Sequence, residues 1–197
     1  RDGWSNSRGA RAVELLAADD SVTVEEALAY AVDAKIYGAN RWIEMLKMAD
    51  AKFGAEARKD GEVAAALDEL LAWDNKLLPE SKGALKYYYW RKQAKADMGD
   101  AYNALRKRVD NFRGSIGVPD PPLDPTGDEL KALITAFSNG MADIKADLGA
   151  LDKTYGDVFR DGRGDKSFPC GGGGDSDHDM RTLRNVNYSG ERDDHTR

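Results

Sequence analysis

Four consecutive glycines, Gly171 to Gly174, place the strongest single constraint on how this chain folds. A backbone without side chains over that length is unfavourable inside a helix or a strand, because glycine loses the most conformational freedom on ordering. We therefore expect the chain to turn there. Helical periodicity precedes the glycines, whereas residues 182–188, TLRNVNY, alternate like a strand. A strand without a partner in the sequence suggests a piece of a larger protein.

Apolar residues recur at helical spacing before the glycines. Thr23 with Glu26, and Thr126 with Glu129, form two capping boxes that predict helix starts, and Asn40 is the expected cap of another helix. Prolines at 119, 121, 122 and 125 predict an extended linker. The predicted helices cover residues 8–18, 23–36, 40–53, 63–71, 81–93, 98–112 and 126–151, and the last is the longest.

Composition excludes several functional classes. The 197 residues are 41% hydrophobic and can bury a core, so the chain is not a disordered tail. The net charge is −6 with both signs interspersed, which argues against a nucleic-acid partner. No apolar run reaches the roughly 20 residues that cross a bilayer. The single cysteine, Cys170, allows no internal disulfide.

Three segments, in order, resemble the penicillin acylase family of N-terminal-nucleophile hydrolases. The first has an arginine before Leu15-Leu16, an acidic gap and a Thr-capped helix with Asp33 inside it. The second is a leucine-rich helix, Trp73-Asp74, a turn and an aromatic-rich helix that ends at Trp90. The third is YGDVFR from Tyr155, then Phe168-Pro169, the glycines and TLRN from Thr182.

The resemblance implies a mechanism and one site residue. In such enzymes a serine, cysteine or threonine at a new N-terminus, exposed by autoproteolysis of a zymogen, attacks the amide carbonyl, and an asparagine stabilises the oxyanion. Arg8 lines up with the family arginine that orients this asparagine, and Arg11 is the alternative if the alignment slips by one turn. The structural alternative is that Arg8 starts a helix and pairs with Asp2 or solvent.

The other candidate motifs carry little chemistry. Asp175, Asp177 and Asp179 alternate as in a calcium loop, but Met180 and Val186 stand where an EF-hand needs glycine and glutamate. Cys170 has no histidine at a pairing distance, since His178 is eight residues away. The glycines lack the Gly-Lys-Ser/Thr of a phosphate loop, and Arg163-Gly164-Asp165 is a chance tripeptide. The cluster Tyr87-Tyr88-Tyr89-Trp90 is expected to pack between helices rather than to line a ligand groove.

We therefore predict a mainly α chain with a short β segment near its C-terminus, the helical region of a large β-chain beside an αββα core. Residues 1–153 form the helical region, with the Pro-rich linker at 115–125, and residues 154–197 form the glycine loop and the start of the β segment. The parent would be an amidohydrolase that cleaves N-acyl amides in β-lactam antibiotics, acyl-homoserine lactones or acyl peptides, with its nucleophile outside this chain. The alternatives are a stand-alone helical scaffold or binding protein, and a catalytically silent relative.

The resemblance also implies partners and surroundings. Partners are the nucleophile-bearing segment, a small α-chain and a small-molecule amide substrate, without nucleic acid or membrane. No cofactor is expected; some relatives hold a structural calcium, for which no ligands are identifiable in this sequence. The family would place the protein in the periplasm or outside the cell.

Overall fold

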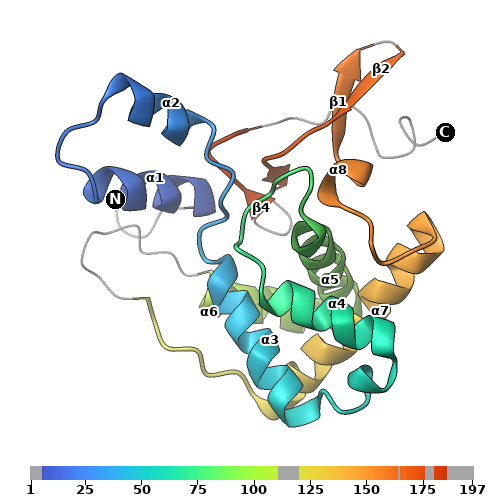
Figure 1. Ribbon diagram of the computed structural model, residues 1–197. Coiled ribbons are helices and arrows are strands. Elements are labelled where there is room, and N and C mark those ends of the chain that lie inside the picture. The colour runs from blue at the N-terminus through green and yellow to red at the C-terminus, as the bar shows by residue number, and fades with distance from the viewer. Residues whose placement is uncertain (1–5, 111–119, 164, 176–179, 186–197) are drawn as a thin grey trace.

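The computed structural model describes residues 6–110, 120–163, 165–175 and 180–185. It is mainly helical, as predicted, with short antiparallel strand pairs near the C-terminal end of the described part (Figure 1). In chain order the elements are α1 (Ser7–Ala17), α2 (Val24–Ala31), α3 (Ala39–Phe53), the 3₁₀ turn η1 (Ala57–Lys59), α4 (Gly61–Leu71), α5 (Lys82–Met98), α6 (Asp100–Val109), α7 (Gly127–Leu148), α8 (Tyr155–Val158), β1 (Arg160–Arg163), β2 (Lys166–Pro169), β3 (Gly174–Asp175) and β4 (Met180–Arg181).

Helices α3 to α7 form one packed unit, called here the bundle, around the pair α5 and α7 (Figure 1). These two helices approach closely because Gly140 has no side chain: a Cβ there would lie 3.0 Å from the backbone oxygen of Tyr89. The indole Nε1 of Trp90 also donates to the backbone oxygen of Leu133 at 3.0 Å. The centre of the bundle therefore combines apolar packing with a satisfied polar group.

The aromatic cluster of α5 packs between helices, as expected. Tyr87, Tyr89 and Trp90 are buried. Trp42 of α3 meets Trp90 edge-on at 6.3 Å between ring centroids and stacks on Tyr102 of α6 at 5.6 Å. Edge-on and stacked contacts of this kind add to the stabilisation from buried area.

Local sequence signals set several helix ends. Both predicted capping boxes are present, at Thr23 and Thr126, and the Ser81 side chain caps α5. The prediction that Asn40 caps α3 is wrong. Gly38 precedes the helix instead, with φ at +83°, a conformation that glycine adopts without steric cost.

The predicted glycine turn is a closely packed strip. Gly171, Gly172 and Gly173 are buried. A Cβ on Gly173 would lie 2.1 Å from the backbone oxygen of Met180, and Gly172 has φ at +89°. The backbone N–H of Gly172 donates to Leu77 O at 2.7 Å. Glycine is needed there for close backbone contact as well as for turning.

The strand predicted over residues 182–188 is wrong for the part that the structure describes. The strand β4 ends at Arg181, and residues 186–188 lie outside the described residues. Beyond β4 the backbone N–H of Thr182 donates to Gly173 O at 3.1 Å and that of Arg184 to Asp33 O at 2.9 Å. The segment thus docks on the glycine strip and on Asp33 instead of extending a ladder.

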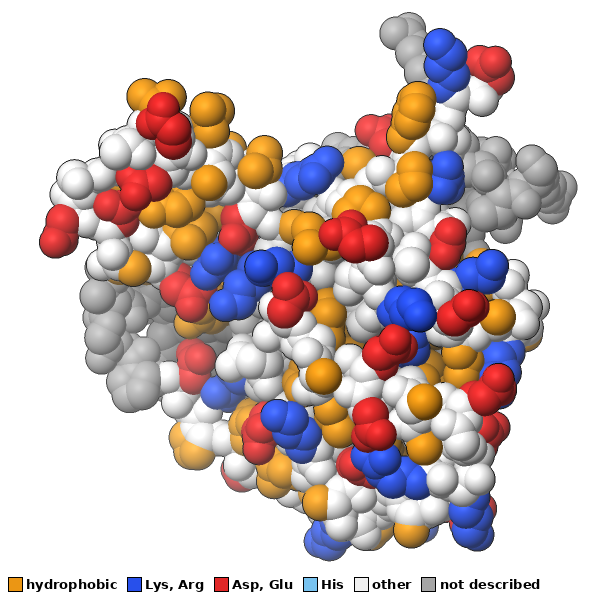
Figure 2. Space-filling model, in the orientation of Figure 1, with side chains coloured by type: hydrophobic (Ala, Val, Ile, Leu, Met, Phe, Trp, Pro, Cys, Tyr) orange, Lys and Arg blue, Asp and Glu red, His pale blue; other side chains and the backbone are white. Residues whose placement is uncertain are grey.

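Two projections rise from the bundle. Helices α1 and α2 form one, called here the arm, and the hairpin β1–β2 forms the other (Figure 1). Orange apolar side chains lie on the outer surface of both (Figure 2). The strands β3 and β4 lie between the two projections, and α1 contacts β4.

Candidate functional site

The N-terminal turn of α1 carries the site. The Asn6 side chain accepts from the backbone N–H of Gly9 at 3.0 Å and so starts the helix at Ser7. The buried Ser7 hydroxyl donates to the backbone oxygen of Arg181 at 3.1 Å. These contacts place Arg8, the next residue, against the segment that follows β4.

Arg8 is held by one edge of its guanidinium. Its Nε donates to the backbone oxygen of Thr182 at 2.8 Å, and its Nη2 donates to Oδ1 of Asn185 at 2.9 Å. Its Nη1 makes no hydrogen bond to any residue that the structure describes, and no described carboxylate forms an ion pair with Arg8. The alternative partner, Asp2, lies outside the described residues. Two donor hydrogens on Nη1 thus stay available for a group outside this part of the chain.

Arg11 is engaged at every nitrogen. Its Nε and Nη2 donate to the two carboxylate oxygens of Asp33 at 3.0 and 2.8 Å, and its Nη1 donates to Glu14 at 2.5 Å. The hydrogen bonds that Arg11 donates to the Asp33 carboxylate are the main reason that the pKa of Arg11 is raised. A guanidinium held in this way has little capacity to orient another group. The contrast favours Arg8 over Arg11 as the arginine with an external partner.

Asp33 joins three parts of the site. The expectation that it lies inside the helix is wrong, because α2 ends at Ala31. Its carboxylate also accepts from the backbone N–H of Lys35 at 3.1 Å, and its backbone oxygen accepts from Arg184. Asp33 therefore fixes α1, the chain after α2 and the segment after β4 relative to one another.

Thr182 connects the site to the glycine strip. Its side chain is buried; its Oγ1 accepts from the backbone N–H of Gly173 at 2.9 Å and donates to the backbone oxygen of Arg184 at 2.7 Å. Thr182 and Asn185 belong to the TLRN segment of the family resemblance, which by itself assigns neither residue a role. The signal that could have found them is the resemblance itself, since its first and third segments meet here.

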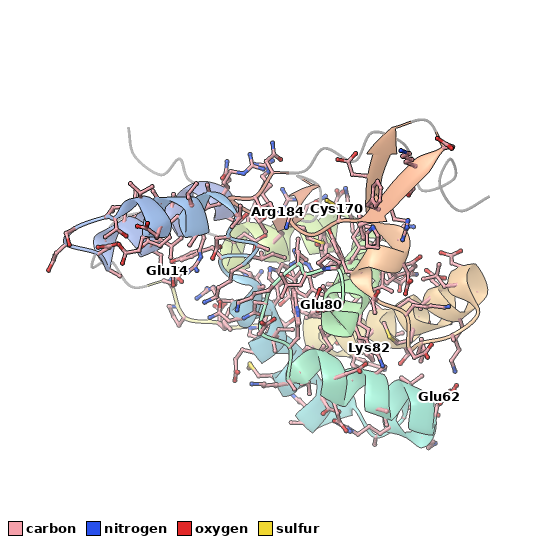
Figure 3. All side chains as sticks on the ribbon, turned by 45° about the horizontal axis from the view of Figure 1, so that its top comes forward. Glu14, Glu62, Glu80, Lys82, Cys170 and Arg184 are labelled. Carbon is pink, nitrogen blue, oxygen red and sulfur yellow. The ribbon has the colours of Figure 1, made fainter. Side chains whose placement is uncertain are left out.

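The remaining candidates do not form a site in the described residues. Of the acidic series, Asp177, Asp179 and the intervening His178 lie outside them. Within the described part, no three His, Cys, Asp or Glu residues are grouped as metal ligands would be, and no helix has the length and apolarity to span a membrane. Cys170 is half-buried, with its Sγ 3.9 Å from Nη2 of Arg184; Figure 3 labels both.

The comparison with known protein families shows the family of this chain. A model of the penicillin amidase family matches residues 2–190. This chain belongs to the penicillin amidase family. That is the family of the acylases that the three sequence segments resemble, and it consists of hydrolases that act on amides. The first and third of those segments lie in direct contact through Arg8, Thr182 and Asn185, although 174 residues separate Arg8 from Thr182 in the sequence.

Proposed function

We propose that this chain is the helical part of a penicillin-amidase-type hydrolase that cleaves N-acyl amide bonds, with Arg8 orienting the asparagine that stabilises the oxyanion. The nucleophile would be the N-terminal residue of a segment outside these residues, attacking the amide carbonyl with its own α-amino group as base. β-Lactams, acyl-homoserine lactones and acyl peptides are the substrate classes to test.

The observation that carries the proposal is the half-used guanidinium of Arg8. An asparagine side chain has an acceptor oxygen and a donor NH₂ group, whereas arginine only donates. A donor from Nη1 of Arg8 would therefore bind the asparagine Oδ1 and turn its NH₂ group toward the oxyanion. The positive charge would also favour the negative charge that develops on the substrate oxygen.

The outer surface of the arm supports a role as one part of a larger enzyme. The exposed large apolar side chains of the described residues lie on the arm, the chain just after it and the hairpin: Leu16, Val22, Val24, Leu28, Val32 and Phe168. Exposed apolar patches in soluble proteins commonly mark interaction sites. We propose that they meet the nucleophile-bearing segment and the small α-chain of the same enzyme.

The test is amide hydrolysis by the complete enzyme with Arg8→Ala. We expect kcat to fall toward the loss seen for one oxyanion donor, about 10²- to 10³-fold, with KM little changed, because the interaction is made in the transition state. Arg58→Ala is the matched control. Arg58 binds both oxygens of Asp50 at 2.8 and 2.7 Å on the bundle surface, and its loss should leave kcat unchanged.

Two results would count against the proposal. An Arg8→Ala enzyme with full kcat would remove Arg8 from the mechanism. A complete enzyme that hydrolyses none of the three substrate classes would remove the amidase activity itself.

A further inference from the structure

The orientation of Arg8 depends on two acceptors that differ in kind. The first is the backbone oxygen of Thr182, which the buried Thr182 side chain holds in place through Gly173 and Arg184. The second is the side-chain oxygen of Asn185, a residue exposed at the surface. Only the second acceptor is itself a side-chain atom.

Two acceptors are needed to fix the plane of a guanidinium. Nε–H and one Nη2–H lie on the same edge of the group, in a rigid fork. With Thr182 alone, the group can pivot about its Nε–H···O bond. The bond to Asn185 at the other end of the edge stops this motion and leaves Nη1 as the corner that faces away.

The chemistry of the acceptor also matters. Arg11 uses the same edge, since its Nε and Nη2 donate to the Asp33 carboxylate, and the negative charge of Asp33 offsets the positive charge of Arg11. Asn185 makes the corresponding contact to Arg8 with a neutral amide oxygen. An amide thus fixes the guanidinium and leaves its full charge for the partner at Nη1.

We propose that Asn185 is a positioning residue: its amide oxygen, together with the Thr182 carbonyl, fixes the guanidinium of Arg8 while preserving the positive charge on which the oxyanion site depends. The inference rests on the proposed function of Arg8. In this proposal the segment after β4 orients the guanidinium of Arg8 on α1.

The experiment is a double-mutant cycle in the complete enzyme with Asn185→Ala, Arg8→Ala and the pair together. We expect Asn185→Ala to lower kcat about 10-fold, the contribution of one hydrogen bond to a charged group, with KM unchanged. In the Arg8→Ala background, Asn185→Ala should cause no further loss, because it acts through Arg8. Asn185→Asp should also lower kcat, because a carboxylate holds Arg8 but offsets its charge.

Asn139→Ala is the matched control. The Asn139 side chain donates to Asp97 at 3.0 Å on the exposed surface of the bundle, far along the chain from the site. This variant also removes a hydrogen bond between an exposed asparagine and a charged side chain, although Asn139 is the donor, and kcat should not change.

The outcomes separate the two proposals. If Arg8→Ala lowers kcat and Asn185→Ala does not, or if Asn185→Ala lowers it equally in the Arg8→Ala background, the role of Asn185 is wrong and that of Arg8 stands. If Arg8→Ala leaves kcat unchanged, the proposed role of Arg8 fails first. A crystal structure of the Asn185→Ala enzyme tests the positioning role independently of activity. An Arg8 guanidinium that has not moved overturns this role, and a rotated guanidinium supports it.

Discussion

The bundle and the arm are held in place by different kinds of interaction. In the bundle, helices bury large side chains against one another: Leu46, Trp90 and Phe137 are all fully buried. In the arm, α2 has no buried residue, and Leu28 is 65% exposed. The bundle thus has a hydrophobic core of its own, whereas the arm has none in the described part of the chain.

Arginine shows the same difference. Arg91 of the bundle is fully buried, with its guanidinium carbon 3.5 Å from the centre of the Trp42 ring and a hydrogen bond from Nε to the Tyr102 hydroxyl. Arg11 of the arm is partly exposed and binds carboxylates. In the bundle a cation is enclosed within the core, whereas in the arm cations attach the helix to the rest of the chain. The position of the arm therefore depends on hydrogen bonds and ion pairs more than on a buried core.

The largest predicted difference between the bundle and the arm is in the stability lost when one leucine is replaced by alanine in each. Leu46→Ala removes a fully buried side chain and leaves a cavity, which should destabilise the protein by about 2–5 kcal/mol. Leu28→Ala removes a side chain that is 65% exposed and should cost about 0.5 kcal/mol or less. Urea unfolding of the two variants measures both. Equal losses would show that the arm is packed in solution as tightly as the bundle.

An intermediate effect is expected when the polar attachment of the arm is broken. Asp33→Asn replaces one acceptor oxygen with an NH₂ group that faces the Arg11 guanidinium, so the paired bonds are lost at a cost of about 1–3 kcal/mol. We expect faster hydrogen exchange in α1 and at Arg184, with the amides of α5 and α7 unchanged.

Asp50→Asn is the matched control for this prediction. Asp50 binds Arg58 of the bundle with the same pair of nitrogens, Nε and Nη2. Because the buried core holds α3 independently, exchange in the bundle should change little. If Asp33→Asn left α1 as protected as before, the arm would be held by something other than its ion pair.

The sequence was most informative where structure is decided locally. The capping boxes at Thr23 and Thr126 were correct because a cap needs only residues three apart. The error at Asn40 arose because a glycine with positive φ can begin a helix without a side-chain cap, and its φ is set by the surrounding chain. The sequence did not predict the hairpin β1–β2, because Arg160–Arg163 has no alternating pattern. In the structure the Arg160 side chain joins the two strands: its Nε donates to Oγ of Ser167 at 2.9 Å and its Nη2 to the backbone oxygen of Ser167 at 3.0 Å.

The candidate site was only partly predictable. Arg8 and Arg11 were identified from the order of family-like segments, but spacing contains no information about acceptors more than 170 residues away, such as Thr182 and Asn185. The division of roles between the two arginines is equally non-local, because it depends on which of them meets Asp33. Local periodicity predicts the fold class, whereas the site is formed by contacts between segments that are distant in the sequence.

The smallest predicted effect compares the capping boxes of α2 and α7. Both place a glutamate carboxylate on the backbone N–H of a threonine, but only Glu129 also binds an arginine among the described residues, with Nη2 of Arg108 at 2.9 and 2.8 Å from its two oxygens. Burial alone would raise the pKa of Glu129. The hydrogen bonds from Thr126 and Arg108 outweigh burial and hold this pKa below its ordinary value of 4.5.

A carboxylate whose pKa is lowered by folding stabilises the folded state above its ordinary pKa, and this contribution is lost as pH falls through the folded-state value. The first turn of α7 should therefore lose up to about 1 kcal/mol of protection as the pH falls below 4.5, the size of a partly exposed ion pair. Amide exchange at Glu129 and Leu130, corrected for the intrinsic pH dependence, measures the loss. Glu129→Gln should show lower protection at neutral pH and no such pH dependence. If the Glu129→Gln variant kept the pH dependence, another carboxylate would be its cause. The capping box of α7 would then not differ from that of α2 in its response to pH.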